Sequence, residues 1–121
     1  MDDTSKTKTE GCDIERSMAE AEGLYNKGYY ERAFVIYLRL ADLGFSPAQF
    51  KAGEMYHYGV GTRTDYAKAL KYYQLATDQH YTIAGYHLAL MYCNGQGVER
   101  NLKKALQIIH SLRDEEEKKE K

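Results

Sequence analysis

The chain repeats itself at a spacing of 36 residues (positions 48 and 84, for example), and this period constrains the fold more than any other feature. Identical residues that coincide under this shift, with no gap, are Ala48 and Ala84, Met55 and Met91, Tyr56 and Tyr92, Gly59 and Gly95, Gly61 and Gly97, and Lys68-Ala69-Leu70 and Lys104-Ala105-Leu106. One step further back, Tyr30, Ala33 and Tyr37 coincide with Tyr66, Ala69 and Tyr73. Such a period is typical of solenoids, in which each unit packs only on its neighbours. The chain therefore holds about two and a half copies of one unit.

Each unit is predicted to form two helices. In the middle copy, Ser46 is a favourable N-cap, Pro47 suits the first helical position and Gln49 completes a capping box. The segment Gly59-Val60-Gly61 predicts the end of the first helix, and Asp65 is predicted to cap the second. In the third copy Thr82 is predicted to start a helix, Gly95-Gln96-Gly97 to end it and Asn101 to cap the next one.

These signals divide the chain into three helical hairpins, predicted over residues 13–45, 46–81 and 82–112. The first copy has no Gly-x-Gly, so its first helix is predicted to run to about Lys27. Residues 1–12 are polar and are predicted to be disordered, and the charged tail 113–121 is predicted to be a solvated, fraying helix. Four tyrosines at helical spacing are predicted to be core residues: Tyr56, Tyr66, Tyr73 and Tyr92.

The segment Ala48–Tyr56, followed by Gly59-Val60-Gly61 and by Asp65–Ala69, resembles the Sel-one-like repeat, a tetratricopeptide-like family. The third copy, from Ala84 to Ala105, matches as well, and the first copy resembles an ordinary tetratricopeptide unit through Gly28, Tyr30 and Ala33. The resemblance implies an all-α, right-handed superhelix of antiparallel helix pairs. It also implies a concave surface of first helices that binds other proteins, in adaptor or scaffold roles.

Composition narrows the range of functions. The chain has 121 residues, of which 43% are hydrophobic and 29% charged, with a formal net charge of −1, so it is the size of one domain and carries no basic excess for nucleic acid. No stretch approaches the roughly 20 apolar residues of a membrane helix, and the N-terminus lacks a secretory signal. Two distant cysteines, Cys12 and Cys93, form no disulfide or metal-ligand pattern. A soluble, cytoplasmic protein is expected if the chain is complete.

Helix geometry predicts which side chains face a partner. On each first helix, the side opposite the apolar stripe should present them toward one shared groove. The predicted partner-binding residues are Met18, Phe50, Glu54, His57, Tyr58, Tyr86, His87, Leu90, Cys93 and Asn94. Phe50 and Tyr86 could equally be half-buried wedges between repeats. Tyr58, His87 and Leu90 are the harder ones to explain as core, and large tyrosine side chains suit binding surfaces.

Other functions find less support in the sequence. No catalytic motif is present, so no enzyme activity and no cofactor are expected, and the Gly-x-Gly segments are too short for a phosphate loop. A metal site formed by His57, His87 and Cys93 is conceivable but matches no ligand spacing. Self-association is the serious alternative. The last helix carries one apolar stripe, widened by Ile108: Leu102, Ala105, Leu106, Ile109 and Leu112. This end is either left partly exposed, covered by a homodimer or continued by further repeats of a longer array, and a partner could also dock there. Ile108 and Leu112 are the predicted residues of a homodimer interface.

Overall fold

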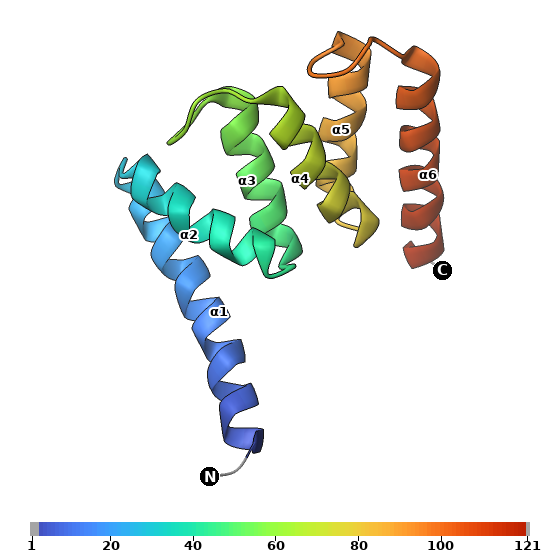
Figure 1. The fold of residues 1–121 in the computed structure, drawn as a ribbon. Helices are drawn as coiled ribbons and strands as arrows, with labels where there is room; N and C mark the ends of the chain where they lie inside the picture. Colours follow the sequence, from blue (N-terminus) through green and yellow to red (C-terminus); the bar gives the residue numbers. More distant parts are fainter. Residues whose placement is uncertain (1–2, 121) are drawn as a thin grey trace.

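In the computed structural model, which describes residues 3–120, six helices form three consecutive hairpins (Figure 1). They are α1 (Asp3–Asn26), α2 (Tyr30–Asp42), α3 (Ser46–Tyr58), α4 (Tyr66–Asp78), α5 (Thr82–Asn94) and α6 (Leu102–Glu120). Each helix packs against the helix before it and the helix after it in the chain. The hairpins therefore form a row, and the two ends of the chain lie at opposite ends of it (Figure 1).

Glycines and short polar side chains end and begin the helices, largely as predicted. Gly59 and Gly95 adopt the left-handed conformation, with φ of 68° and 65°, and their amides donate to the carbonyls of Met55 and Met91. Asp65 accepts a hydrogen bond from the Lys68 amide at 3.1 Å, and Asn101 accepts one from the Lys104 amide at 2.9 Å. The predicted helix ends at 59–61 and 95–97 and the caps at Asp65 and Asn101 are thus confirmed.

The predicted capping box at the start of α3 is wrong. Phe45 occupies the N-cap position, and no side chain caps this end. Gln49 is buried instead, where its amide donates to the Ala41 carbonyl at 3.2 Å and accepts from Gln79 at 2.8 Å. The Ala41 carbonyl belongs to the last turn of α2, where it also accepts from the Gly44 amide at 3.0 Å, so Gln49 connects α3 to the end of α2.

The core consists of small residues on one helix packed against aromatic residues on the next. Fully buried alanines, at 0% exposure, include Ala48, Ala52, Ala69, Ala76 and Ala84. Among the four predicted core tyrosines, Tyr56 and Tyr73 are buried and Tyr92 is half-buried against the core. Tyr66 is 38% exposed, so that prediction is wrong. The reason is its place at the start of α4, where its Cβ supports the turn at Gly97 while its ring remains at the surface.

The N-terminal end of the fold differs from the predicted boundary, whereas the charged C-terminal segment is helical, as expected. Helix α1 begins at Asp3, so residues 3–12, predicted as disordered, are helical, while residues 1–2 lie outside the described part. This segment holds no proline, and it extends a helix that tertiary contacts already hold beyond residue 13. At the other end α6 continues through the charged segment as far as Glu120, and residue 121 lies outside the described part.

Candidate protein-binding groove

Helices α1 and α3 and the residue before α5 enclose an open cavity of about 370 Å³, which we call the groove. Its lining comprises Met18, Glu22, Tyr25 and Asn26 of α1, Tyr37 of α2, Pro47, Phe50, Lys51 and Glu54 of α3, and Tyr81. The lining residues of α1 recur at positions 18, 22 and 25, the spacing that places side chains on one helix face. Repetition of the hairpin therefore sets two first helices side by side and leaves a hollow between them.

Lys51 is held in a fixed position within the groove. Its Nζ lies 3.9 Å from the centre of the Tyr25 ring and 3.8 Å from Oε1 of Glu54. The negative face of the ring and the carboxylate both attract the ammonium group of a lysine in this position. The cation of Lys51 is thus already neutralised within the chain.

The remaining charge of the groove is negative. Burial, followed by the nearby carboxylates of Glu22 and Glu54, raises the pKa of the Tyr37 hydroxyl to about 12. Burial also raises the pKa of Tyr25, with Glu54 as the next cause. Burial is the main cause of both shifts, and the carboxylates add to it. The negative charge of the groove follows from its lining, which holds the two carboxylates of Glu22 and Glu54 and the single ammonium of Lys51.

Aromatic side chains form the wall of the groove toward the third hairpin. The Phe50 ring lies 5.5 Å from that of Tyr81, 5.1 Å from that of His87 and 6.0 Å from that of Tyr73. Phe50 is half-buried by these contacts, and so it is a wedge between repeats as well as a lining residue. Such offset and edge-on pairs hold aromatic rings firmly in place.

The structure brings three of the ten predicted partner-binding residues into the groove: Met18, Phe50 and Glu54. Tyr58, Tyr86 and Leu90 are exposed at 57%, 38% and 46%, but they lie outside it, as do His87, Cys93 and Asn94. The prediction missed Tyr25, Tyr37 and Tyr81. The stripe at 18, 22 and 25 could have revealed Tyr25, whereas Tyr37 and Tyr81 reach the groove only through the packing of other helices.

His57 is buried and is not available to a partner, contrary to the prediction. Its side chain is 5% exposed, and its ring nitrogens lie 3.3 Å from the Tyr73 hydroxyl and 3.0 Å from Oε1 of Gln96. Because the Gln96 carbonyl can only accept, Nε2 of His57 donates and Nδ1 accepts from Tyr73. His57 therefore ties the second hairpin to the turn after α5, and its place in helix α3 alone could not show this.

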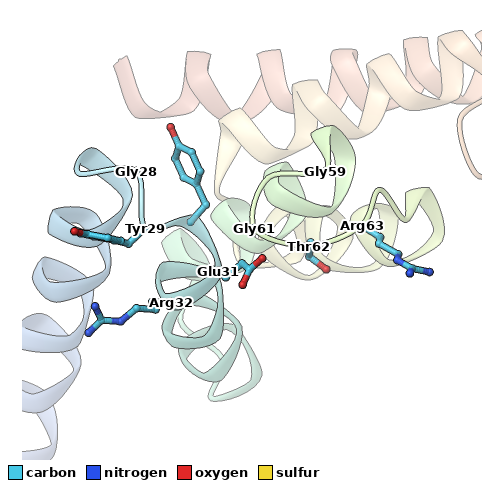
Figure 2. Close-up of a pocket in the computed structure, with 9 residues that line it drawn as sticks. Gly28, Tyr29, Glu31, Arg32, Gly59, Gly61, Thr62 and Arg63 are labelled. Carbon is cyan, nitrogen blue, oxygen red and sulfur yellow. The ribbon is translucent and has the colours of Figure 1, made fainter.

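A larger depression of about 660 Å³ lies at the loop end of the first two hairpins (Figure 2). Its two arginines, Arg32 and Arg63, point away from each other in Figure 2 and do not converge on a common ligand position. Gly61 at its floor approaches the preceding hairpin so closely that a Cβ there would lie 2.5 Å from the Tyr30 carbonyl oxygen. The glycine turn thus serves helix termination and packing between repeats.

Neither a metal centre nor a membrane span is found in the part of the chain that the structure describes. Within it, no group of three or more His, Cys, Asp or Glu side chains is arranged to hold a metal ion. No described helix combines the length and the apolar character that crossing a bilayer requires.

Comparison with known sequences decides the family. The sequence model of the Sel1 repeat matches residues 46–81 and 83–108, which correspond to the second and third hairpins. The chain belongs to the Sel1 repeat family.

Among proteins of this kind, the chain is 38% identical over 84 residues to sel-1 homolog 2 of Mus musculus, which covers 69% of the chain and 12% of that protein. It is 32% identical over 77 residues to the ERAD-associated E3 ubiquitin-protein ligase component HRD3A of Arabidopsis thaliana, which covers 64% of the chain and 11% of that protein. The chain therefore spans only about an eighth of the length of these two relatives.

Solved Sel1-type structures share the architecture. A Sel1 repeat protein from Oxalobacter formigenes superposes with a TM-score of 0.74 at 29% identity, over 84% of this chain and 43% of that one. A protective antigen of uropathogenic Escherichia coli with an SLR fold superposes with a TM-score of 0.78 at 24% identity, over 93% and 25% of the two chains. The all-α, right-handed solenoid of helical hairpins predicted from the sequence is thus confirmed.

Proposed function

We propose that this Sel1 repeat chain is a non-catalytic adaptor that binds a protein or peptide through the groove of α1 and α3. The observation that carries the proposal is the meeting of Met18, Phe50 and Glu54, from two different hairpins, in one open cavity. Membership of a family of adaptors and scaffolds supports it, and one relative bears the name of a ligase complex component. We propose no cofactor for the protein. We propose the cytoplasm as its location.

The chemistry of the groove favours a segment with an apolar side chain next to a basic one. Met18 and Phe50 offer apolar contact, and Tyr25 and Tyr81 add aromatic edges. Lys51 is already paired with Glu54, which leaves Glu22 as an exposed carboxylate at the rim. An arginine or lysine of the partner would find its counter-charge there, and charge complementarity of this kind selects partners and speeds association.

Selection from a random-peptide library on the purified chain tests the proposal. We expect enriched sequences to share a basic residue within one or two positions of a large apolar residue. Titration of such a peptide into the isotope-labelled chain should shift the amide signals of α1 and α3 near Met18, Glu22 and Lys51. Shifts confined to the loops at Gly28 and Thr62, or to α6, would contradict the assignment of the groove.

A further inference from the structure

The outward face of α6 carries an apolar stripe that the described part of the chain leaves largely exposed. Leu102 and Leu106 are 51% and 57% exposed, and Ile109 is half-buried. Their spacing of four and three residues places them in one row along the helix, as in the contact seam of paired helices. Exposed neighbours of this kind mark interaction sites more often than isolated apolar residues do.

The equivalent row on α4, one repeat earlier, packs against the next hairpin. Subtracting 36 from each position leads to Tyr66, Leu70 and Tyr73 on α4, and this row meets the third hairpin. A Cβ added to Gly97 would lie 2.8 Å from the Cβ of Tyr66, and the Tyr73 ring lies 5.4 Å from the His87 ring. The row on α6 is thus in the position at which the solenoid receives its next helices.

The two residues predicted for an oligomer interface, Ile108 and Leu112, face the other way. Leu112 is 2% exposed and fills the space beside Gly85, and Ile108 is half-buried against the core that contains Leu88. The prediction assumed that the following repeat covers Tyr72, the counterpart of Ile108. In the structure Tyr72 points back and donates a hydrogen bond to Asp42 at 2.7 Å. The correction moves the candidate interface to Leu102, Leu106 and Ile109.

The charges that flank this row identify what covers it. Exposed Lys103 stands at the N-terminal end of α6, and exposed Glu116 and Glu117 stand toward its C-terminal end. This order opposes the helix dipole, which favours acidic residues at the N-terminus and basic ones at the C-terminus. A second α6 lying antiparallel would set Lys103 of each copy beside Glu117 of the other, because these two residues lie on the same flank of the helix, and would also oppose the two dipoles. A parallel second α6 would set like charges together.

We propose that two copies of this chain pair through antiparallel α6 helices, with Leu102, Leu106 and Ile109 in the seam. The long aliphatic stem of Arg113, on the same face, would lie over Leu106 of the second copy. The groove is formed by the first two hairpins, so it stays open in this dimer. Two grooves in one particle would bind a repeated or multivalent partner more tightly than one. This inference does not depend on what the groove binds.

Sedimentation equilibrium over a concentration series tests the dimer directly. We expect the wild-type mass to rise toward two chains with concentration, and Leu106→Lys to remain monomeric. Val35→Lys is the matched control, because Val35 is 56% exposed on a different helix, and it should dimerise like wild type. A wild-type chain that stays monomeric up to about 200 µM, a concentration at which even weak specific pairs are populated, overturns the proposal.

A charge swap tests the antiparallel orientation. Lys103→Glu and Glu117→Lys alone should each weaken dimerisation about tenfold, because each change breaks two symmetric pairs. The double variant should return to within about threefold of wild type. Lys103→Glu should also slightly stabilise the monomer against urea, since a carboxylate suits a helix N-terminus, so weaker pairing cannot be put down to unfolding. A double variant as weak as the single ones contradicts the antiparallel arrangement.

Discussion

The ring of Tyr73 lies directly against the α carbon of Gly53, so that a Cβ at Gly53 would stand 2.7 Å from Cδ1 of that ring. Tyr73 is fully buried and its hydroxyl bonds His57, so the ring has little freedom to move. One repeat later the equivalent positions hold Ala89 and Ile109, so the sequence exchanges the glycine and the aromatic ring together.

Gly53→Ala should destabilise the fold despite the better helix propensity of alanine. Overpacking costs roughly 1–3 kcal/mol, and the propensity gain returns up to about 1 kcal/mol, so we expect a net loss of about 1 kcal/mol in urea unfolding. Gly85→Ala is the control, because the atoms met there are the movable methyl groups of Leu112. The same Gly53→Ala change should cost less in a Tyr73→Ile background, which copies the third repeat. An equal cost in both backgrounds would contradict this packing.

Tyr72→Phe should weaken the junction of the first two hairpins. The Tyr72 hydroxyl donates to Oδ1 of Asp42 at 2.7 Å, and burial, followed by this bond, raises the pKa of Tyr72 far above its ordinary value. Since Asp42 is exposed, we expect a loss of about 1 kcal/mol of unfolding free energy, the usual net value of such a bond. Tyr58→Phe, at an exposed tyrosine, should change stability by less than the error of the measurement.

Asp65→Ala should cost about 1 kcal/mol, the typical value of a lost N-cap, because the Lys68 amide loses its acceptor. Asp65→Asn should retain most of the stability, since an amide oxygen also caps well. Urea unfolding of the three proteins at neutral pH gives the comparison. A loss in Asp65→Asn as large as that in Asp65→Ala would show that the charge of Asp65, rather than its cap, stabilises α4.

Stability should fall in mild acid because of His87. Burial lowers the pKa of His87, a nearby His57 lowers it further and Glu54 opposes both, while Nδ1 of His87 is buried with no hydrogen-bond partner among the described residues. In the unfolded chain the imidazole titrates near its ordinary pKa of about 6.5. Below that pH the unfolded chain takes up the proton first, so the free energy of unfolding falls until the lower, folded pKa is reached.

The measurement is urea unfolding at about pH 7.5 and about pH 5, on either side of the ordinary histidine pKa. His87→Phe keeps an aromatic ring beside Phe50 and Tyr73 but cannot bind the proton. We expect the loss between the two pH values to be smaller in His87→Phe than in wild type. An equal loss of unfolding free energy in the two proteins would mean that groups other than His87 cause the acid sensitivity.

The sequence was a good guide to the repeat and to most helix ends, although the capping box at Ser46 and Gln49 was wrong. The repeat period, the left-handed Gly59 and Gly95 and the caps at Asp65 and Asn101 all depend on local backbone chemistry. Helix periodicity also placed Met18, Phe50 and Glu54 on the surface that forms the groove.

What could not be predicted is which neighbour covers a given helix face. His57 is buried because Gln96, from a turn of the next hairpin, reaches it. Ile108 faces inward because its row points back toward the preceding hairpin, as Tyr72 shows. A helical wheel gives the direction of a side chain from its own axis, and the position of the adjacent helix is needed to say what that side chain touches.

The affinity of a library-selected basic, apolar peptide for two charge variants tests the central claim most directly. Glu22 lines the groove, while Glu20 is exposed on the same helix and points away from it. We predict that Glu22→Lys weakens binding about tenfold, or about 1.4 kcal/mol, and that Glu20→Lys changes it less than twofold. Equal affinity of the two variants, or a larger loss in Glu20→Lys, would contradict recognition through the groove.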